Sequence, residues 1–251
     1  LTKLDLSSNK LTGTISSQIG SLSHLQVVDL SANQITGSIP SQISSLFELT
    51  ILYLFSNHFT GPIPSSLQNL TNLDKLYLFS NSLTGTIPSS LGSLSKLNFL
   101  YLGSNNLTGS IPSSLGSLSR INILSLYNNH FTGSIPSSFG SLSRLEKIEL
   151  RKNQLNGTLP SSLGNCFTLS FIQLYDNQFT GPLPSFYGNV TNLEELYLSS
   201  NYLSQSIPST FSQLLTLTVL NLSDNQLTGT VPSFIGSFTN LLSLTLANNS
   251  F

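Results

Sequence analysis

Apolar and polar residues alternate in a short pattern that recurs along the whole chain at one fixed interval. The segment LNFLYLGSNNLTGSIPSSLGSLSR, residues 97–120, contains one full copy. If its first leucine is position 1, then positions 1, 4 and 6 are apolar, and the alternation predicts a short half-buried strand. Stacked copies predict a parallel sheet with strands ~4.8 Å apart. Position 9 is an asparagine that returns every 24 residues, at Asn9, Asn33, Asn57, Asn81, Asn105, Asn129, Asn153, Asn177, Asn201, Asn225 and Asn249.

The other fixed positions predict how the chain returns from one strand to the next. We expect the asparagine amide to bond backbone groups where the chain leaves the strand, because those groups lose their sheet partners there. Glycine at position 13, replaced only by Gln205, predicts a bend that a Cβ would oppose. Proline at position 16, from Pro40 to Pro232, disfavours a long helix. The Ser-Ser-Leu-Gly-Ser-Leu segment that follows is therefore predicted to form at most a short helical or 3₁₀ turn.

The recurring string LTGxIPxxLGxLxxL resembles the plant-type subfamily of extracellular leucine-rich repeats, and the resemblance covers the whole chain. It implies a right-handed α/β solenoid with a parallel β-sheet on its concave face and short strands and 3₁₀ turns on its convex face. A second, short sheet near the LTGxIP segment is also implied. Members of this family are receptor-like kinase ectodomains, receptor-like proteins, polygalacturonase inhibitors and a few ice-binding proteins.

The unbroken period predicts one elongated solenoid over residues 1–251, with eleven strand segments, rather than two domains. The resemblance implies cysteine-paired caps at the ends of such a solenoid. This sequence has none, so we expect an uncapped fragment of a longer protein. The single cysteine, Cys166, occupies position 22, where most other copies have leucine, and we expect it to be a small buried hydrophobe.

Charge and hydropathy narrow the classes of partner. Only 8% of the residues are charged and the net charge is −1, which argues against nucleic acid or an anionic membrane as partner. No run of ~18 apolar residues exists, so we expect no membrane contact by this segment, whatever a full-length chain contains. The resemblance and several Asn-x-Ser/Thr sequons favour an extracellular or cell-surface protein of the secretory pathway. The glycosylation candidates are Asn69, Asn106, Asn156 and Asn189.

Large aromatic side chains gather at strand positions that face away from the core. One interpretation is structural, since aromatic pairs on adjacent strands contribute ~0.2–1 kcal/mol each to a sheet. The other is recognition, since large exposed apolar patches usually mark interaction sites and aromatic residues are frequent binding hot spots. We favour recognition. The predicted ligand-binding residues of the concave face are Tyr53, Phe55, Tyr77, Phe79, Phe99, Tyr101, Tyr127, Arg151, Lys152, Phe171, Tyr175 and Tyr197.

A charged strand interrupts the aromatic series in the seventh repeat. Glu149 can pair there with Lys147 or Arg151, and an exposed pair contributes only ~0–1 kcal/mol. We expect Arg151 and Lys152 to contact an acidic group at one end of a ligand. Some peptide receptors of the family hold a terminal carboxylate with Arg-x-Arg on one strand. This chain has Glu149-Leu150-Arg151 instead, so that role does not carry over.

Catalytic and metal-binding patterns are missing from the sequence. His58 and His130 share position 10 but lie three repeats apart, and His24 belongs to another part of the repeat. No serine or cysteine has a histidine at a spacing that suggests a nucleophile, and no metal-ligand cluster or phosphate loop occurs. We therefore predict no catalytic residue, no metal and no cofactor, with all three histidines on the surface.

Three functions remain after these exclusions. The preferred one is non-enzymatic recognition of a peptide or protein ligand by the concave face of a receptor ectodomain, with a leucine-rich repeat co-receptor as candidate second partner. The first alternative is inhibition of a secreted cell-wall-degrading enzyme by the same face. The second is ice binding through threonine and serine at positions 12 and 14, a ladder that Pro62, Pro182 and the Gln205 repeat interrupt.

Overall fold

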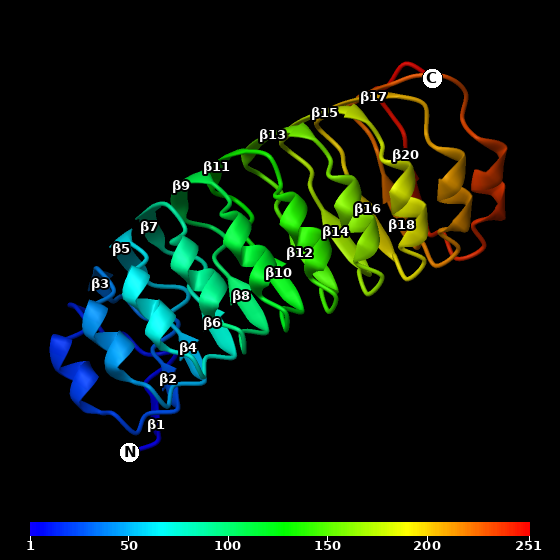
Figure 1. Ribbon diagram of the computed structural model, residues 1–251. Coiled ribbons are helices and arrows are strands. Elements are labelled where there is room, and N and C mark those ends of the chain that lie inside the picture. The colour runs from blue at the N-terminus through cyan, green and yellow to red at the C-terminus, as the bar shows by residue number, and fades with distance from the viewer.

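A computed structural model describes all 251 residues as a solenoid whose repeats stack in chain order, from the blue N-terminal end to the red C-terminal end of Figure 1. Each repeat contributes a strand to one long parallel sheet, most contribute a second short strand, and a single-turn helix closes the unit. The predicted fold class is confirmed. No helix has the length and hydrophobicity that crossing a membrane requires.

The eleven-stranded concave sheet is formed by the residues at positions 3 to 5 of every repeat. Each residue pairs with the residue 24 positions further on, so Tyr53, Tyr77 and Tyr101 are direct neighbours. Equal positions therefore form straight columns across this sheet. Its strands are β1 (Lys3–Asp5), β2 (Val27–Asp29), β4 (Ile51–Tyr53), β6 (Lys75–Tyr77), β8 (Phe99–Tyr101), β10 (Ile123–Ser125), β12 (Lys147–Glu149), β14 (Phe171–Gln173), β16 (Glu195–Tyr197), β18 (Val219–Asn221) and β20 (Ser243–Thr245).

The second sheet has a different register. Its residues pair with partners 22 positions further on, so Thr108 lies opposite His130 and Thr36 opposite His58. Equal positions are thus displaced by two residues along the strand, which puts them roughly 8 Å apart instead of ~4.8 Å. Each repeat therefore advances further at this sheet than at the concave sheet. The strands are β3 (Thr36–Gly37), β5 (His58–Pro62), β7 (Ser82–Gly85), β9 (Asn106–Ser110), β11 (His130–Gly133), β13 (Gln154–Thr158), β15 (Gln178–Pro182), β17 (Tyr202–Gln205) and β19 (Gln226–Leu227).

All ten helices are 3₁₀ helices of five residues, and no α-helix occurs. Nine of them begin directly after the position-16 proline, which confirms the prediction of a short 3₁₀ turn. The helices are η1 (Ser17–Ser21), η2 (Ser41–Ser45), η3 (Ser65–Asn69), η4 (Ser89–Ser93), η5 (Ser113–Ser117), η6 (Ser137–Ser141), η7 (Ser161–Asn165), η8 (Ser185–Asn189), η9 (Ser209–Gln213) and η10 (Ser233–Ser237).

One continuous core of 61 buried residues runs the length of the stack. Position-6 leucines such as Leu126 are fully buried, whereas Leu6 in the first repeat is 40% exposed because no repeat covers it. Cys166 is buried as predicted, and its thiol donates to the Phe139 carbonyl over 3.2 Å. Burial raises the pKa of this thiol to about 11, so it stays protonated at neutral pH.

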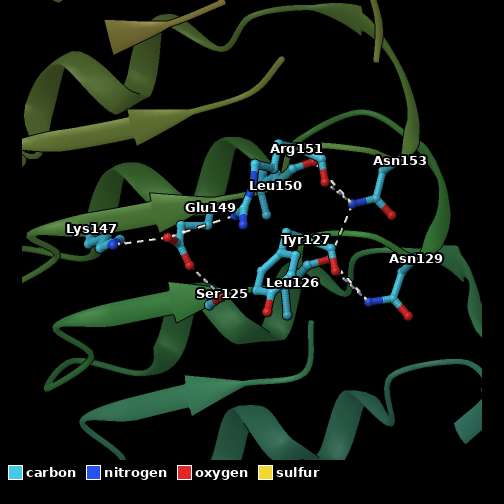
Figure 2. A network of polar contacts seen from close by, with 9 residues as sticks. All are labelled: Ser125, Leu126, Tyr127, Asn129, Lys147, Glu149, Leu150, Arg151 and Asn153. Carbon is cyan, nitrogen blue, oxygen red and sulfur yellow. Dashed lines mark hydrogen bonds and ion pairs between the residues drawn. The ribbon is translucent and has the colours of Figure 1, made fainter. Parts of the chain in front are cut away.

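The asparagines at position 9 of the repeat connect the two sheets and also connect neighbouring repeats. The Asn129 amide Nδ2 donates to the carbonyls of Leu126 and Tyr127, both at 3.2 Å, and to that of Leu102 in the preceding repeat at 3.1 Å. Its Oδ1 accepts from the backbone N–H of Leu107 over 2.9 Å, just inside the second sheet. Figure 2 shows Asn129 and the equivalent Asn153 at the strand ends. Each interior asparagine thus satisfies backbone groups in two repeats.

Two positions in the repeat have left-handed backbone conformation. Position 13 is one, with φ of 73° to 89° at its glycines, and Gln205 adopts φ 65° in the same place. Position 8 is the other: all eleven copies, none of them glycine, have φ between 51° and 56°. Sequence reasoning missed the second site. Serine, asparagine and aspartate are frequent there, and asparagine and aspartate tolerate this region better than most residues.

Candidate functional site

The first aromatic cluster consists of Tyr53, Phe55, Tyr77, Phe79, Phe99 and Tyr101 on three adjacent concave strands. Phe55 and Phe79 stack with ring centroids 4.5 Å apart and planes inclined by 8°. Tyr77 lies 4.6 Å from both Tyr53 and Tyr101. This contact follows from the equal register of the sheet, which aligns position 5 with position 5. Five of the rings therefore form one continuous surface, and the sixth, Phe99, has the Lys75 ammonium 5.4 Å from its centroid.

All six rings of this cluster are half-buried rather than fully exposed. Burial, together with the neighbouring phenols Tyr53 and Tyr101, raises the pKa of Tyr77 above its ordinary value. Burial also raises the pKa of Tyr101, with a further contribution from the Glu149 carboxylate. The surface is therefore neutral and ordered, and its rings are held largely by one another.

Tyr127 connects the first cluster to the charged strand. A Cβ placed on Gly103 would clash with the Tyr127 ring, so this ring covers the space that the position-7 glycine leaves in the preceding repeat. The Arg151 guanidinium carbon lies 3.9 Å from the same ring centroid and 6.0 Å from that of Tyr175. Arg151 is thereby placed between two tyrosines of neighbouring repeats.

Glu149 is the centre of a polar network on β10 and β12 (Figure 2). Its carboxylate accepts from Ser125 Oγ over 2.6 Å, and pairs with Lys147 Nζ at 2.9 Å and Arg151 Nη1 at 3.8 Å. The pairing partners are those the sequence suggested. The expectation of an exposed pair was wrong, however, because Glu149 is only 8% exposed and Ser125 is buried completely. A buried carboxylate needs its partners, since removing one leaves an uncompensated charge.

Arg151 and Lys152, the expected contacts for an acidic ligand group, differ in their surroundings. Arg151 Nη1 is buried and makes no hydrogen bond within the protein, and Gln173 Oε1 on the next strand is buried and unpaired as well. Lys152 is exposed and has a φ of 56°, at the position-8 turn beyond the strand. The rings of Tyr127 and Tyr175 therefore hold the Arg151 guanidinium in place, and its buried Nη1 has no hydrogen-bond acceptor within the protein.

The second aromatic cluster consists of Phe171, Tyr175 and Tyr197 on β14, β16 and the residues just after β14. Its centroids are 6.0 Å apart for Phe171 and Tyr197 and 6.4 Å apart for Tyr175 and Tyr197. The Lys147 ammonium lies 4.1 Å from the Phe171 centroid. The Tyr197 hydroxyl donates to Glu195 Oε2 over 2.8 Å. Burial, this hydrogen bond and the Glu195 charge raise the pKa of Tyr197 to about 12.

The remaining predicted positions lie outside these clusters. His58 and His130 are exposed, and His24 is exposed beside Glu48, with 2.9 Å between Nδ1 and Oε1. No group of three or more histidine, cysteine, aspartate or glutamate side chains is placed to hold a metal. The four glycosylation candidates are exposed: Asn69 and Asn189 at the ends of η3 and η8, and Asn106 and Asn156 on the second sheet.

Sequence reasoning missed the exposed aromatic residues of the outer surface. Phe47 and Phe167, both at position 23, are 59% and 60% exposed, and Phe186 is 53% exposed in a shallow groove beside Pro160 and Pro184. The sequence does distinguish Phe47 and Phe167, because position 23 carries serine, threonine or leucine in the other repeats. They are isolated from each other along the chain and do not form a column.

Comparison with protein families identifies the architecture. A family model described as "Leucine-rich repeat region" matches residues 1–160, and another described as "Leucine rich repeat" matches residues 185–251. The chain belongs to the leucine-rich repeat family. Its similarity to plant receptor ectodomains shows that the repeats are of the plant type, as the LTGxIP string suggested.

Three solved structures illustrate what this leucine-rich repeat chain resembles. A TDR receptor is 38% identical with a TM-score of 0.89, over 99% of this chain and 47% of the receptor. The ectodomain of the Arabidopsis receptor kinase HAESA, in complex with an IDA peptide hormone ligand, is 37% identical with a TM-score of 0.92, over 98% of this chain and 42% of HAESA. A plant ice-binding protein is 28% identical with a TM-score of 0.82, over 99% and 83%.

The chain spans less than half the length of the two receptor structures. Among curated proteins, no sequence matches it. The similarity therefore establishes repeat type and architecture, and the role of the individual concave-face residues stays a prediction.

Proposed function

We propose that this protein recognises a peptide, or an extended segment of a protein, through the concave face of an extracellular receptor ectodomain. The proposal rests on one observation: the first aromatic cluster forms a continuous surface of half-buried rings across β4, β6 and β8. Its similarity to a receptor ectodomain that binds a peptide hormone supports the same function. No catalytic step is part of the proposal.

Preordered rings are well suited to binding. A side chain placed on them gains apolar contact, while the receptor loses little conformational freedom because the rings already pack on one another. Tyrosine is also enriched among the residues that dominate binding energy. Beyond the first cluster, Lys152 is exposed and Arg151 is partly exposed, and we expect both side chains to contact an acidic group of the ligand.

The test uses a library of random dodecapeptides displayed on phage and selected on the purified protein. The variant Tyr77→Ala with Phe79→Ala is expected to weaken the selected peptides by ~2 kcal/mol or more, which is roughly thirtyfold. The matched control is Phe47→Ala with Phe167→Ala, which also removes two rings but from outside the concave face. Selected peptides that bind the first double variant as well as wild type would contradict the proposal.

The ring contacts revise one expectation about folding. Both side chains face away from the core, and this position alone predicts that the Tyr77 and Phe79 variant folds almost normally. Tyr77 contacts Tyr53, Phe55, Phe79 and Tyr101, so the pair also supports the sheet. A stability loss of about 1–2 kcal/mol is now expected from these contacts. Binding is therefore measured well below the melting temperature of the variant.

Two other functions are separable from this one. Inhibition of a secreted cell-wall-degrading enzyme would use the same face, and an assay of polygalacturonase activity with added protein tests it directly. Ice binding is favoured by the similarity to an ice-binding protein over 83% of that protein's length and by exposed threonines on the second sheet. The two-residue register shift counts against it, because equal-position threonines there are not direct neighbours.

A further inference from the structure

Basic residues are confined to one part of the chain, whereas acidic residues occur along its whole length. All nine lysine and arginine residues and all three histidines lie at or before Lys152. Residues 153–251 contain four acidic residues, Asp176, Glu194, Glu195 and Asp224, and no basic one. Glu195 is the first residue of β16, Glu194 directly precedes it, and Asp176 lies in the turn three residues after the end of β14.

The second aromatic cluster differs from the first in how its ring faces are used. In the first cluster the closest rings are 4.5 to 4.6 Å apart, in stacked, tilted and edge-to-face contact. In the second the centroids are 6.0 and 6.4 Å apart, so the rings are not closely stacked. A cation already lies against its edge: the Lys147 ammonium is 4.1 Å from the Phe171 centroid. Rings in this part of the concave face therefore bind cations within the protein itself.

Carboxylates complete the environment around these rings. Glu195 is held by the Tyr197 hydroxyl at 2.8 Å, and that hydrogen bond increases the electron density of the ring. Glu194 and Asp176 are exposed and make no ion pair, so their charge is available to a partner. Lys147 and Arg151 are paired with Glu149, which reduces the repulsion that they exert on an incoming cation. The exposed Lys152 lies one repeat before Asp176, at the far end of the strands from Glu194 and Glu195.

We propose that the second aromatic cluster, with the Glu195 carboxylate beside Tyr197, binds an arginine or lysine side chain of the peptide ligand. Glu194 just before β16 and Asp176 beyond the end of β14 add negative charge on either side of this site. This inference rests on the proposed function, because it places the cationic residue on the same ligand that covers the first cluster. The ligand then has a fixed direction, with its apolar part over β4 to β8 and its basic part over β14 to β16. Charge complementarity suppresses the opposite orientation, which would leave the ligand's cation beside Lys75 over an apolar surface.

The experiment uses the same displayed dodecapeptide library and two changes of charge. Selected peptides are expected to be enriched in arginine and lysine. In a synthetic copy of each, replacement of arginine by citrulline, its neutral isostere, is expected to weaken binding about tenfold. The variant Glu194→Gln with Glu195→Gln is expected to show a similar loss. The control, Asp5→Asn with Asp29→Asn, removes two carboxylates from strands β1 and β2 of the same face and is expected to leave affinity unchanged within twofold.

The possible outcomes separate this inference from the proposed function. Peptides that need Tyr77 and Phe79 but tolerate citrulline, with less than twofold loss, would overturn the cation site and leave the concave-face function intact. Equal losses in the Glu194/Glu195 variant and the Asp5/Asp29 control would also overturn it, because the effect would then be a long-range effect of net charge. Peptides indifferent to Tyr77 and Phe79 would overturn the proposed function and this inference together.

Discussion

The concave sheet takes a strand from all eleven repeats and the second sheet a strand from nine of them, yet the two sheets pair in different registers. In the concave sheet residue i faces residue i+24, as Tyr53 faces Tyr77, and in the second sheet it faces i+22, as Thr108 faces His130. Equal register turns a recurring residue into a column of touching side chains. The shifted register separates the same residues, so periodicity in sequence produces a continuous surface on one sheet only.

The asparagine at position 9 holds the two registers together, and removing it tests that connection most strongly. Asn129→Ala is expected to cost about 3 kcal/mol of unfolding free energy, because carbonyls on two repeats and the Leu107 N–H lose their partner in a buried site. The matched control is Asn9→Ala, whose amide has no bond to a preceding repeat. Urea denaturation that gave equal losses for both variants would contradict a connecting role.

Much of this architecture could be predicted from sequence, because it follows from local alternation and from one-residue requirements. The strands, the inward leucines, the glycine bend and the 3₁₀ turn after proline are of this kind. The two-residue shift of the second sheet could not be predicted, because it depends on the spacing between neighbouring repeats on that side of the curved stack. The aromatic residues of the candidate site could be found from the sequence because they occupy strand positions that face away from the core. The packing of the Tyr127 ring over Gly103 and the burial of Glu149 could not be predicted, because both depend on contacts between different repeats.

The bend at the end of the second sheet permits a test of smaller magnitude. Gln205 adopts φ 65° where other repeats have glycine. Gln205→Gly is expected to raise the free energy of unfolding by about 0.5 kcal/mol, since relief of left-handed strain exceeds the added flexibility of the unfolded chain. The reverse change, Gly133→Gln, is expected to cost about 1 kcal/mol. A Cβ at Gly133 meets its nearest atom only at 3.7 Å, so this variant tests backbone strain rather than a clash.

The smallest expected effect concerns the influence of the protein on the freezing point of its solution. Because the second sheet separates its threonines, we expect no thermal hysteresis above that of an inert protein of equal size. Sequons at Asn106 and Asn156 lie on this sheet, so glycans there would cover the threonine surface in a secreted protein. Measurable hysteresis that Thr132→Lys abolished, and that Thr245→Lys on β20 did not, would establish ice binding instead.

The equal register of the concave sheet also gives that surface a regular spacing, which an extended ligand has to match. Side chains on one face of an extended peptide recur every ~6.6 Å, whereas the strands beneath recur every ~4.8 Å. Three ligand steps therefore match four repeats, at roughly 19–20 Å. Tyr101 on β8 and Tyr197 on β16 are separated by four repeats. Two ligand residues six positions apart, on the same face of the peptide, can therefore be in phase with both aromatic clusters, and residues at intermediate spacings fall out of phase with at least one.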